Sequence, residues 1–452
     1  MTGEGPAPSV GDVLGLLLRP RRPVDATTTF YVLTAVVAFA LALCFTLNLV
    51  FQYRVVGLDP LQLVLVGTVL EATCFLFEVP TGVVADLHSR RVSVIIGFLL
   101  IGVGFAVEGV VATFAAAIVG NVVWGIGYTF TSGALQAWIT DEVGEESVGP
   151  VFTRETQLDL AFGIVGTLAA GALGLVSLRV PVIVAGVTLM LLAVWLWVVM
   201  PENHFRPVPR GDQETFAHLR GQVVAGLRIA RARRVVRVFL LVSLLVGLAS
   251  EVFDRLWRVR LLEGFGLPAV FGGDEAVAFT AFALVGTVVS LMASLASGRW
   301  LPRQLVAAHP GLPVAVAALL QVVAVAGVAL LGNVWLVLAC VWLRGAAMAF
   351  SAPIEATWLN RNLDGATRAT VLSMNGQANA VGQVIGGPPL GALATRTSIP
   401  VALVVAAVVQ APSVVAVWRV RRAGGSPAGD DVTASGVSEA SGAAGAPGTH
   451  LG

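Results

Sequence analysis

The sequence contains no lysine and little charge of either sign. Only 12% of its 452 residues are charged, whereas a soluble domain carries about 25%. All 28 residues counted as Lys or Arg are arginine, and the formal net charge of +1 gives no general reason to expect nucleic acid as a partner. With 56% hydrophobic residues, the composition excludes an ordinary soluble domain and indicates an integral membrane protein.

Motifs for nucleotide, metal and covalent chemistry are also absent from the sequence. It has no P-loop ending in Gly-Lys-Ser/Thr, no HExxH and no nucleophile elbow, so we expect neither an ATP-driven pump nor an enzyme. Its three cysteines, Cys44, Cys74 and Cys340, lie inside apolar runs without CxxC spacing, which favours small core residues over a disulfide or a metal site. We therefore expect no metal and no cofactor.

Long apolar runs are what the sequence has in abundance. Each is about 20 residues long, which is enough to cross roughly 30 Å of hydrocarbon as an α-helix. The predicted fold class is an all-α integral membrane protein with twelve transmembrane helices. These helices are expected near residues 29–51, 61–84, 92–111, 114–138, 156–177, 180–200, 236–259, 275–298, 312–331, 333–356, 370–394 and 399–419.

The polar segments divide the chain into two halves. The longest polar interruption follows the sixth predicted helix and is rich in arginine, so we expect two six-helix bundles, residues 29–200 and 236–419. The other expected parts are a cytoplasmic N-terminal segment (1–28), a cytoplasmic linker (201–235) and a disordered cytoplasmic tail (420–452), whose Gly, Ala and Ser cannot build a core.

The arginines predict the orientation in the membrane. With the N-terminus inside, 21 of the 28 arginines fall in cytoplasmic segments and five fall outside, as the positive-inside rule requires. We therefore expect a multi-pass protein of the plasma membrane with both termini in the cytoplasm.

An internal repeat supports the division into six plus six helices. At one fixed offset of 220 residues, the fourth helix segment 124–131 matches segment 344–351 of the tenth, and Trp138 matches Trp358. Both halves would start and end on the same side, so the repeats are parallel and related by an axis along the membrane normal. Two similar bundles of this kind can rock about a site between them.

A short polar segment between the second and third predicted helices carries the residues Gly82, Asp86, Arg90 and Arg91. It resembles the signature loop of the major facilitator superfamily, although Leu87 replaces a usual basic residue and Ser89 a usual glycine. With the twelve helices, the basic linker and the parallel repeats, the resemblance extends over residues 29–419. It implies a secondary transporter that works by alternating access on a small-molecule substrate.

The signature-loop residues are expected to act as a conformational latch. Gly82 would allow close approach of the eleventh helix, and Asp86 would accept hydrogen bonds from the N-terminus of that helix near Thr370, where the helix dipole favours an anion. Arg90 and Arg91 complete the charge network of this loop. The latch would hold the cytoplasmic side closed.

Among members of this superfamily, the chain looks most similar to bacterial drug/proton antiporters. Its fourth helix has Trp124-Gly125 without the arginine that those proteins commonly carry, whereas the tenth has Arg344-Gly345. The resemblance implies proton-coupled efflux of hydrophobic or amphiphilic small molecules by a monomer in the lipid bilayer. The alternatives are proton-coupled uptake of a nutrient and a receptor or scaffold that does not transport.

Ionisable side chains within apolar runs are candidates for proton coupling, because burying them in a membrane is costly. Glu71 lies in the middle of the second helix and is the first candidate; the alternative is a hydrogen bond to Thr73 or to a neighbouring helix without a transport role. In the seventh helix, Glu251, Asp254 and Arg255 are expected to form an internal salt bridge, serving as a gate or proton relay or simply as a wetted helix end.

The tenth helix has a further candidate acid. Arg344, Met348, Ser351 and Glu355 recur on one face, with Arg344 and Glu355 about 16 Å apart by helical rise and too distant to pair. Glu355 is expected either to carry a coupling proton or to reach water and pair with Arg361.

In the resembled fold the first, fourth, seventh and tenth helices line the substrate cavity. This nominates polar and aromatic residues and one methionine of those helices as cavity residues. They are Asn48, Gln52, Trp124, Tyr128, Arg344 and Met348, together with Glu251. Trp124 and Tyr128 form an aromatic stripe suited to flat or cationic compounds, or they serve in packing.

Overall fold

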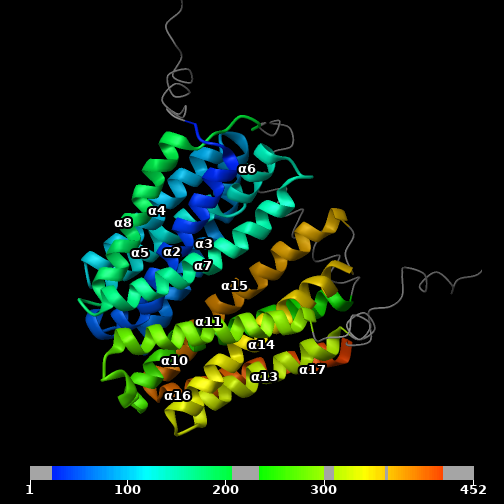
Figure 1. Ribbon diagram of the computed structural model, residues 1–452. Coiled ribbons are helices and arrows are strands. Elements are labelled where there is room, and N and C mark those ends of the chain that lie inside the picture. Colours follow the sequence, from blue (N-terminus) through cyan, green and yellow to red (C-terminus); the bar gives the residue numbers. More distant parts are fainter. Residues whose placement is uncertain (1–22, 206–233, 300–309, 362–364, 421–452) are drawn as a thin grey trace, which may run out of the picture.

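The computed structural model describes residues 23–205, 234–299, 310–361 and 365–420, and these residues are mostly helical (Figure 1). Within these ranges the chain forms twelve membrane-length helical segments, which confirms the predicted all-α fold. The first set is α2 (Ala26–Phe51), α3 (Pro60–Leu87), α4 (Arg90–Val110), α5 (Phe114–Thr131) with α6 (Ala134–Val143), α7 (Val148–Gly174) and α8 (Arg179–Val199). The second set is α10 (Arg234–Gly264), α11 (Glu275–Arg299), α13 (Gly311–Leu330), α14 (Val334–Arg361), α15 (Gly365–Arg396) and α16 (Ile399–Gln410) with α17 (Pro412–Val420).

Polar residues before the apolar runs start several helices. Asp25 caps α2 by accepting a hydrogen bond from the backbone N–H of Thr28 (3.0 Å). Asp59 and Gln62 form a reciprocal capping box at the start of α3, and Ser89 caps α4. Such side chains satisfy backbone N–H groups that have no partner within the helix.

Several helices extend beyond the predicted ranges. α7 begins at Val148 instead of 156, α15 begins at Gly365 instead of 370, and α10 continues to Gly264 instead of ending at 259. The reason is that an apolar run marks only the part of a helix that lies in hydrocarbon, whereas helical hydrogen bonding continues into polar flanks.

The fourth membrane segment is not the single helix predicted for 114–138. α5 ends at Thr131, and α6 starts after Gly133, whose φ of 76° is left-handed and interrupts the helix. At the offset of 220 residues, Gly133 corresponds to Pro353, which lies inside α14. Trp138 and Trp358, also related by this offset, are both buried. The repeat therefore places helix-perturbing residues at equivalent depths of the two halves.

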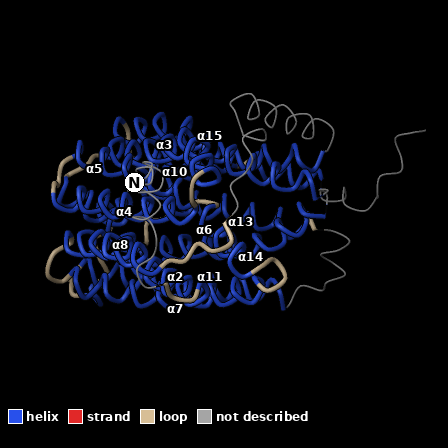
Figure 2. Tube along the Cα trace, turned by 90° about the horizontal axis from the view of Figure 1, so that it is seen from above, coloured by secondary structure: helices blue, strands red, loops and turns tan. Residues whose placement is uncertain are grey.

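The two sets of helices form two bundles that lie side by side (Figure 1). Within the first bundle α2 packs on α7 and α4 packs on α5 and α8, and within the second α10 packs on α15 and α14 on α11 and α13. The bundles meet mainly through α3 with α15 and through α7 with α11. Figure 2 shows the same helices from above, joined by short loops.

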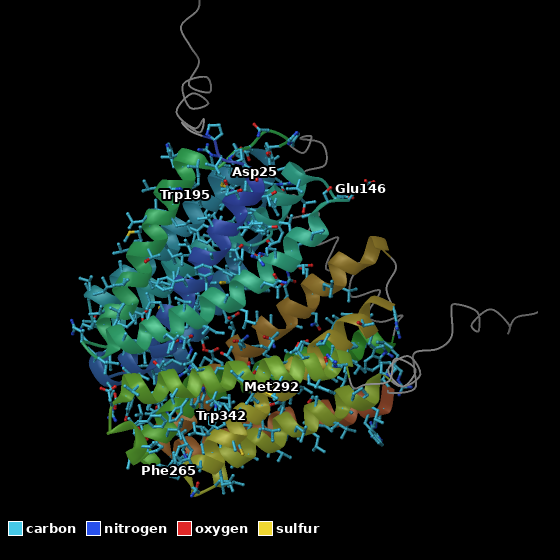
Figure 3. The ribbon with its side chains drawn as sticks, in the orientation of Figure 1. Asp25, Glu146, Trp195, Phe265, Met292 and Trp342 are labelled. Carbon is cyan, nitrogen blue, oxygen red and sulfur yellow. The ribbon has the colours of Figure 1, made fainter. Side chains whose placement is uncertain are left out.

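The helices run between two ends of the molecule, which we name after one residue each. The Gly57 end holds the α2–α3, α4–α5, α7–α8, α10–α11 and α13–α14 connections. The His88 end holds the α3–α4 and α6–α7 connections and the start of α2. In Figure 3, Asp25 and Glu146 mark the His88 end and Phe265 marks the Gly57 end.

Contacts between the bundles concentrate at the Gly57 end. A Cβ on Gly174 of α7 would lie 2.7 Å from Cβ of Ala276 of α11, and one on Gly387 of α15 would lie 2.8 Å from Oγ1 of Thr68 of α3. The backbone N–H of Leu61 donates to Oγ1 of Thr395 across the interface (3.0 Å). The glycines thus allow the helix backbones of the two bundles to pack closely at this end.

The outward surface of the helices is apolar, as a lipid-facing surface must be. Leu191 and Val194 of α8 and Met292 of α11 are more than 60% exposed. Eleven of the helical segments in the described ranges are long and apolar enough to cross a membrane. α15 has the length but is more polar, because it carries Asn375, Gln377 and other amides.

Parts of the predicted domain layout lie outside the described residues. These are residues 1–22 of the N-terminal segment, 206–233 of the linker and 421–452 of the tail. The expected disorder of the tail is among them. The two-bundle division itself agrees with the helical sets described above.

Candidate transport site

A cavity of about 340 Å³ lies between the two bundles on the His88 side of their contacts. The first bundle contributes α3 and α5, and the second contributes α15. The lining residues are Glu71, Cys74, Phe75, Glu78, Tyr128, Thr129, Ser132, Leu372, Ser373, Gly376, Gln377 and Ala380. A polar cavity closed at one end by helix contacts is the arrangement that a membrane carrier needs for binding a solute.

Glu71 and Glu78 bring two carboxylates to this cavity from the same face of α3. They are separated by seven residues, or two helical turns. The alternative hydrogen bond between Glu71 and Thr73 is not formed, because the Thr73 hydroxyl donates to the backbone O of Val69 (2.7 Å). Glu71 thus faces the cavity without a hydrogen bond to Thr73. Glu78 is a cavity residue in addition to those predicted from the sequence.

The predicted internal salt bridge of the seventh membrane helix is confirmed for Glu251 and Arg255. Nε of Arg255 lies 2.9 Å from Oε1 of Glu251, and both side chains are largely buried. The pair sits against Gly67 of α3 in the other bundle, where a Cβ would overlap the Glu251 carboxylate and lie 2.6 Å from Nε of Arg255.

Asp254 does not pair with Arg255, so the prediction that it takes part in this salt bridge is wrong. Its Oδ1 accepts a hydrogen bond from Arg344 of α14 (3.0 Å), whose guanidinium also lies over the ring of Phe253 (4.2 Å). The reason is that Asp254 directly precedes Arg255, and neighbouring residues of a helix point about 100° apart, so the Asp254 carboxylate points toward α14 and not toward the Arg255 guanidinium. Arg344 is buried in this pairing and does not line the cavity between the bundles.

Glu355 and Met348 line a second cavity, of about 180 Å³, inside the second bundle. Gln321, Asn379 and Gln410 also line it. Glu355 therefore lies away from the cavity between the bundles, and its expected pairing with Arg361 does not appear among the ion pairs of the described side chains.

Trp124 and Tyr128 line a third cavity, of about 360 Å³, inside the first bundle. Tyr128 and Ser132 belong to this cavity and also to the one between the bundles. The cavities inside the two bundles are related by the repeat. Tyr128, Thr131, Ser132 and Leu135 of the first correspond, at the offset of 220, to Met348, Ser351, Ala352 and Glu355 of the second.

Asn48 and Gln52 do not line any of these cavities, so their prediction as cavity residues is wrong for this conformation. They lie in a buried polar cluster around Glu108 of α4, which is only 2% exposed. Nε2 of Gln52 donates to Oε1 of Glu108 (2.6 Å), and Nδ2 of Asn121 donates to Oε2 (3.2 Å). Glu108 was missed because it stands near the end of an apolar run, where a sequence suggests contact with water.

The signature loop lies at the His88 end, within the first bundle. Arg90 pairs with Asp86 of its own loop (3.8 Å) and with Asp141 of α6. Arg91 is buried, and its backbone N–H donates to Glu202 (2.9 Å). Apart from its own turn of α3, no described atom lies within 4 Å of where a Cβ on Gly82 would be, so the close approach expected there is not made in this conformation.

Two membrane-spanning bundles around a polar cavity, in contact at one end, define the molecule as a membrane transporter. The chain belongs to the Major Facilitator Superfamily, whose family model matches residues 26–332. It is 24% identical over 358 residues to the uncharacterized MFS-type transporter YxaM of Bacillus subtilis (strain 168), covering 77% of this chain and 85% of that protein.

Solved structures share the fold. The nucleoside transporter NupG has a TM-score of 0.68 at 13% identity, covering 88% of this chain and 99% of that one. A POT family transporter in complex with 5-aminolevulinic acid has a TM-score of 0.67 at 14% identity, with coverages of 89% and 98%. A bacterial homolog of the human lysosomal transporter Spinster, in an inward-facing and unoccupied conformation, has a TM-score of 0.63 at 14% identity, with coverages of 88% and 95%.

Proposed function

We propose that this transporter is a proton-coupled exporter of hydrophobic or amphiphilic small molecules that works by alternating access as a monomer. The observation that carries the proposal is the place of Glu71. Its side chain lines the cavity between the bundles, and Gly67, one helical turn earlier on α3, lies against the Glu251–Arg255 pair at the contact that separates this cavity from the Gly57 end.

The arginines support an assignment of the two ends. Eight arginines with described side chains lie at the His88 end, and five lie at the Gly57 end. The first group is Arg90, Arg91, Arg154, Arg234, Arg237, Arg299, Arg361 and Arg419, and the second is Arg54, Arg179, Arg258, Arg260 and Arg396. By the positive-inside rule, the His88 end and both termini are then cytoplasmic in a plasma membrane, and this conformation faces inward.

The coupling step follows from how a carboxyl group responds to water. A glutamate in a dry environment is favoured as the neutral acid, whereas a wetted one is favoured as the anion. Glu71 is wetted when its cavity opens to the cytoplasm and releases a proton there. When the bundles rock, Gly67 moves away from Glu251 and Arg255, and Glu71 then faces the outer medium. The higher proton concentration there protonates the carboxylate, which is then favoured as the neutral acid when the site becomes dry again.

Inverted membrane vesicles test this proposal. A respiration-acidified lumen quenches a fluorescent weak base, and a compound that enters in exchange for protons restores the fluorescence. We expect this response to at least one member of a panel of hydrophobic compounds with the wild type, and its loss with Glu71→Gln. The matched control Glu146→Gln changes an exposed acid in the α6–α7 connection and is expected to respond as the wild type does.

Three results would count against the proposal. An equal response in vesicles that lack the protein, or an undiminished response with Glu71→Gln, removes the role of Glu71 in coupling. Proton-driven accumulation of a compound in the same direction as protons would show uptake instead of export.

A further inference from the structure

The cavity between the bundles and the cavity inside the first bundle adjoin one another. Tyr128 and Ser132 line both, so the two spaces, of about 340 and 360 Å³, meet along one edge of α5. Tyr128 is 51% exposed, which is consistent with a ring that stands between two open spaces. We call the two together the joint site.

One half of the joint site holds two carboxyl groups, and no arginine lines it. Glu71 and Glu78 supply two carboxylates from α3, and the facing helix α15 supplies neutral groups, chiefly Ser373 and Gln377. Two carboxylates about 10 Å apart along a helix leave room for a positive group between them.

The arginines nearest in the membrane are already engaged. Arg255 is held by Glu251 and Arg344 by Asp254. None of the described arginine side chains lines either cavity of the joint site. A carboxylate removed from bulk water is costly without a partner, so a ligand with a positive charge gains most by binding here.

The other half of the joint site is apolar and aromatic. Phe45 and Trp124 line it, with ring centroids 5.3 Å apart, and Phe105 packs against both from behind. Val37, Leu41 and Ile101 extend the apolar wall. Aromatic walls of this kind bind flat apolar groups and also attract cations over their ring faces.

We propose that the joint site binds amphipathic organic cations, with the positive group at Glu71 and Glu78 and the apolar body against Phe45 and Trp124. This inference rests on the proposed function, because it takes the cavity between the bundles as the transport site. It assigns Glu78 to substrate binding, while Glu71 serves both the substrate and the proton.

Two ions of nearly the same shape and opposite charge test the inference. Tetraphenylphosphonium binding is measured on the purified full-length protein in detergent without a pH gradient, and tetraphenylborate is the competitor. We expect the phosphonium ion to bind, the borate ion not to displace it, and Glu78→Gln to weaken binding roughly tenfold. Glu78→Asp, which keeps the charge, should retain binding, and Glu146→Gln should leave it unchanged.

The outcomes separate this inference from the proposed function. Equal binding of both ions, stronger binding of borate, no binding of either, or full binding by Glu78→Gln would overturn the assignment of cations to the joint site. If the phosphonium ion binds as expected but no compound exchanges with protons in vesicles, the inference stands and proton coupling fails. If neutral compounds exchange with protons while the phosphonium ion does not bind, proton coupling stands and the assignment of cations to the joint site fails.

Discussion

Nε of Arg54, in the π-helical turn that follows α2, lies 2.7 Å from Oε1 of Glu275 at the start of α11. This ion pair joins the first bundle to the second at the Gly57 end. The hydroxyl of Tyr53, one residue earlier, donates to Glu263 at the end of α10 (2.9 Å). Neighbouring residues of one turn therefore hold two helices of the opposite bundle.

Arg54→Gln should destabilise the conformation in which the Gly57 end is closed. The two side chains are 43% and 22% exposed, so the pair is worth at most about 1 kcal/mol, and the population open at this end should rise about two- to fivefold. The measurement is the distance between spin labels at Val111→Cys and Gly332→Cys, in the two bundles at this end, after replacement of the native cysteines. Arg179→Gln at the same end is the control and should leave the distances unchanged.

Gly67→Ala should disturb the contact between the bundles more strongly. The new methyl group would overlap the Glu251 carboxylate, and the buried salt bridge with Arg255 leaves little room to move. We expect transport to fall at least tenfold while the protein still folds, because the closed Gly57 end can no longer form. Gly163→Ala is the control, since no described atom lies within 4 Å of its added Cβ; unchanged transport by both variants would contradict this reading.

Glu108→Leu should destabilise the first bundle. The substitution leaves the buried amides of Gln52 and Asn121 without their acceptor, and each such loss costs about 1–3 kcal/mol. Glu108→Gln keeps an acceptor oxygen and should be milder. Thermal unfolding of the purified variants in detergent checks the order, and a Glu108→Leu protein as stable as Glu108→Gln would show that the cluster is not structural.

Asp86→Asn should shift the balance of conformations if the predicted latch exists. The latch would form only when the His88 end closes, so its loss should increase the population open at that end. Spin labels at Glu145→Cys and Arg361→Cys report this distance. Asp141→Asn is the comparison, because it removes an Arg90 ion pair without touching Asp86; equal distances in Asp86→Asn and the wild type would rule out the latch.

The helices were predictable because a membrane imposes one simple rule, a run of apolar residues of fixed length. The break at Gly133 was not, because a glycine inside an apolar run is also common in uninterrupted membrane helices. α15 was found by sequence despite its amides, since apolar residues still alternate with them over its whole length.

The site was only partly predictable, because helical spacing says which residues share a face but not what that face meets. Glu71 was nominated for its central position and does line the cavity. Asn48 and Gln52 were nominated from the resembled fold, yet the rotation of α2 turns them toward Glu108. Rotation about a helix axis is set by packing with neighbours, which a single sequence does not reveal.

The offset of 220 residues relates an aromatic pocket in one bundle to a pocket with a carboxyl group in the other. If the halves arose by duplication, the two pockets of the ancestral protein had the same lining residues. In the present chain the two pockets differ: Met348 stands at the position equivalent to Tyr128, and Glu355 at the position equivalent to Leu135. Because each pocket is lined by its own half of the chain, a substitution in one half can change the shape or charge of one pocket and leave the other unaltered.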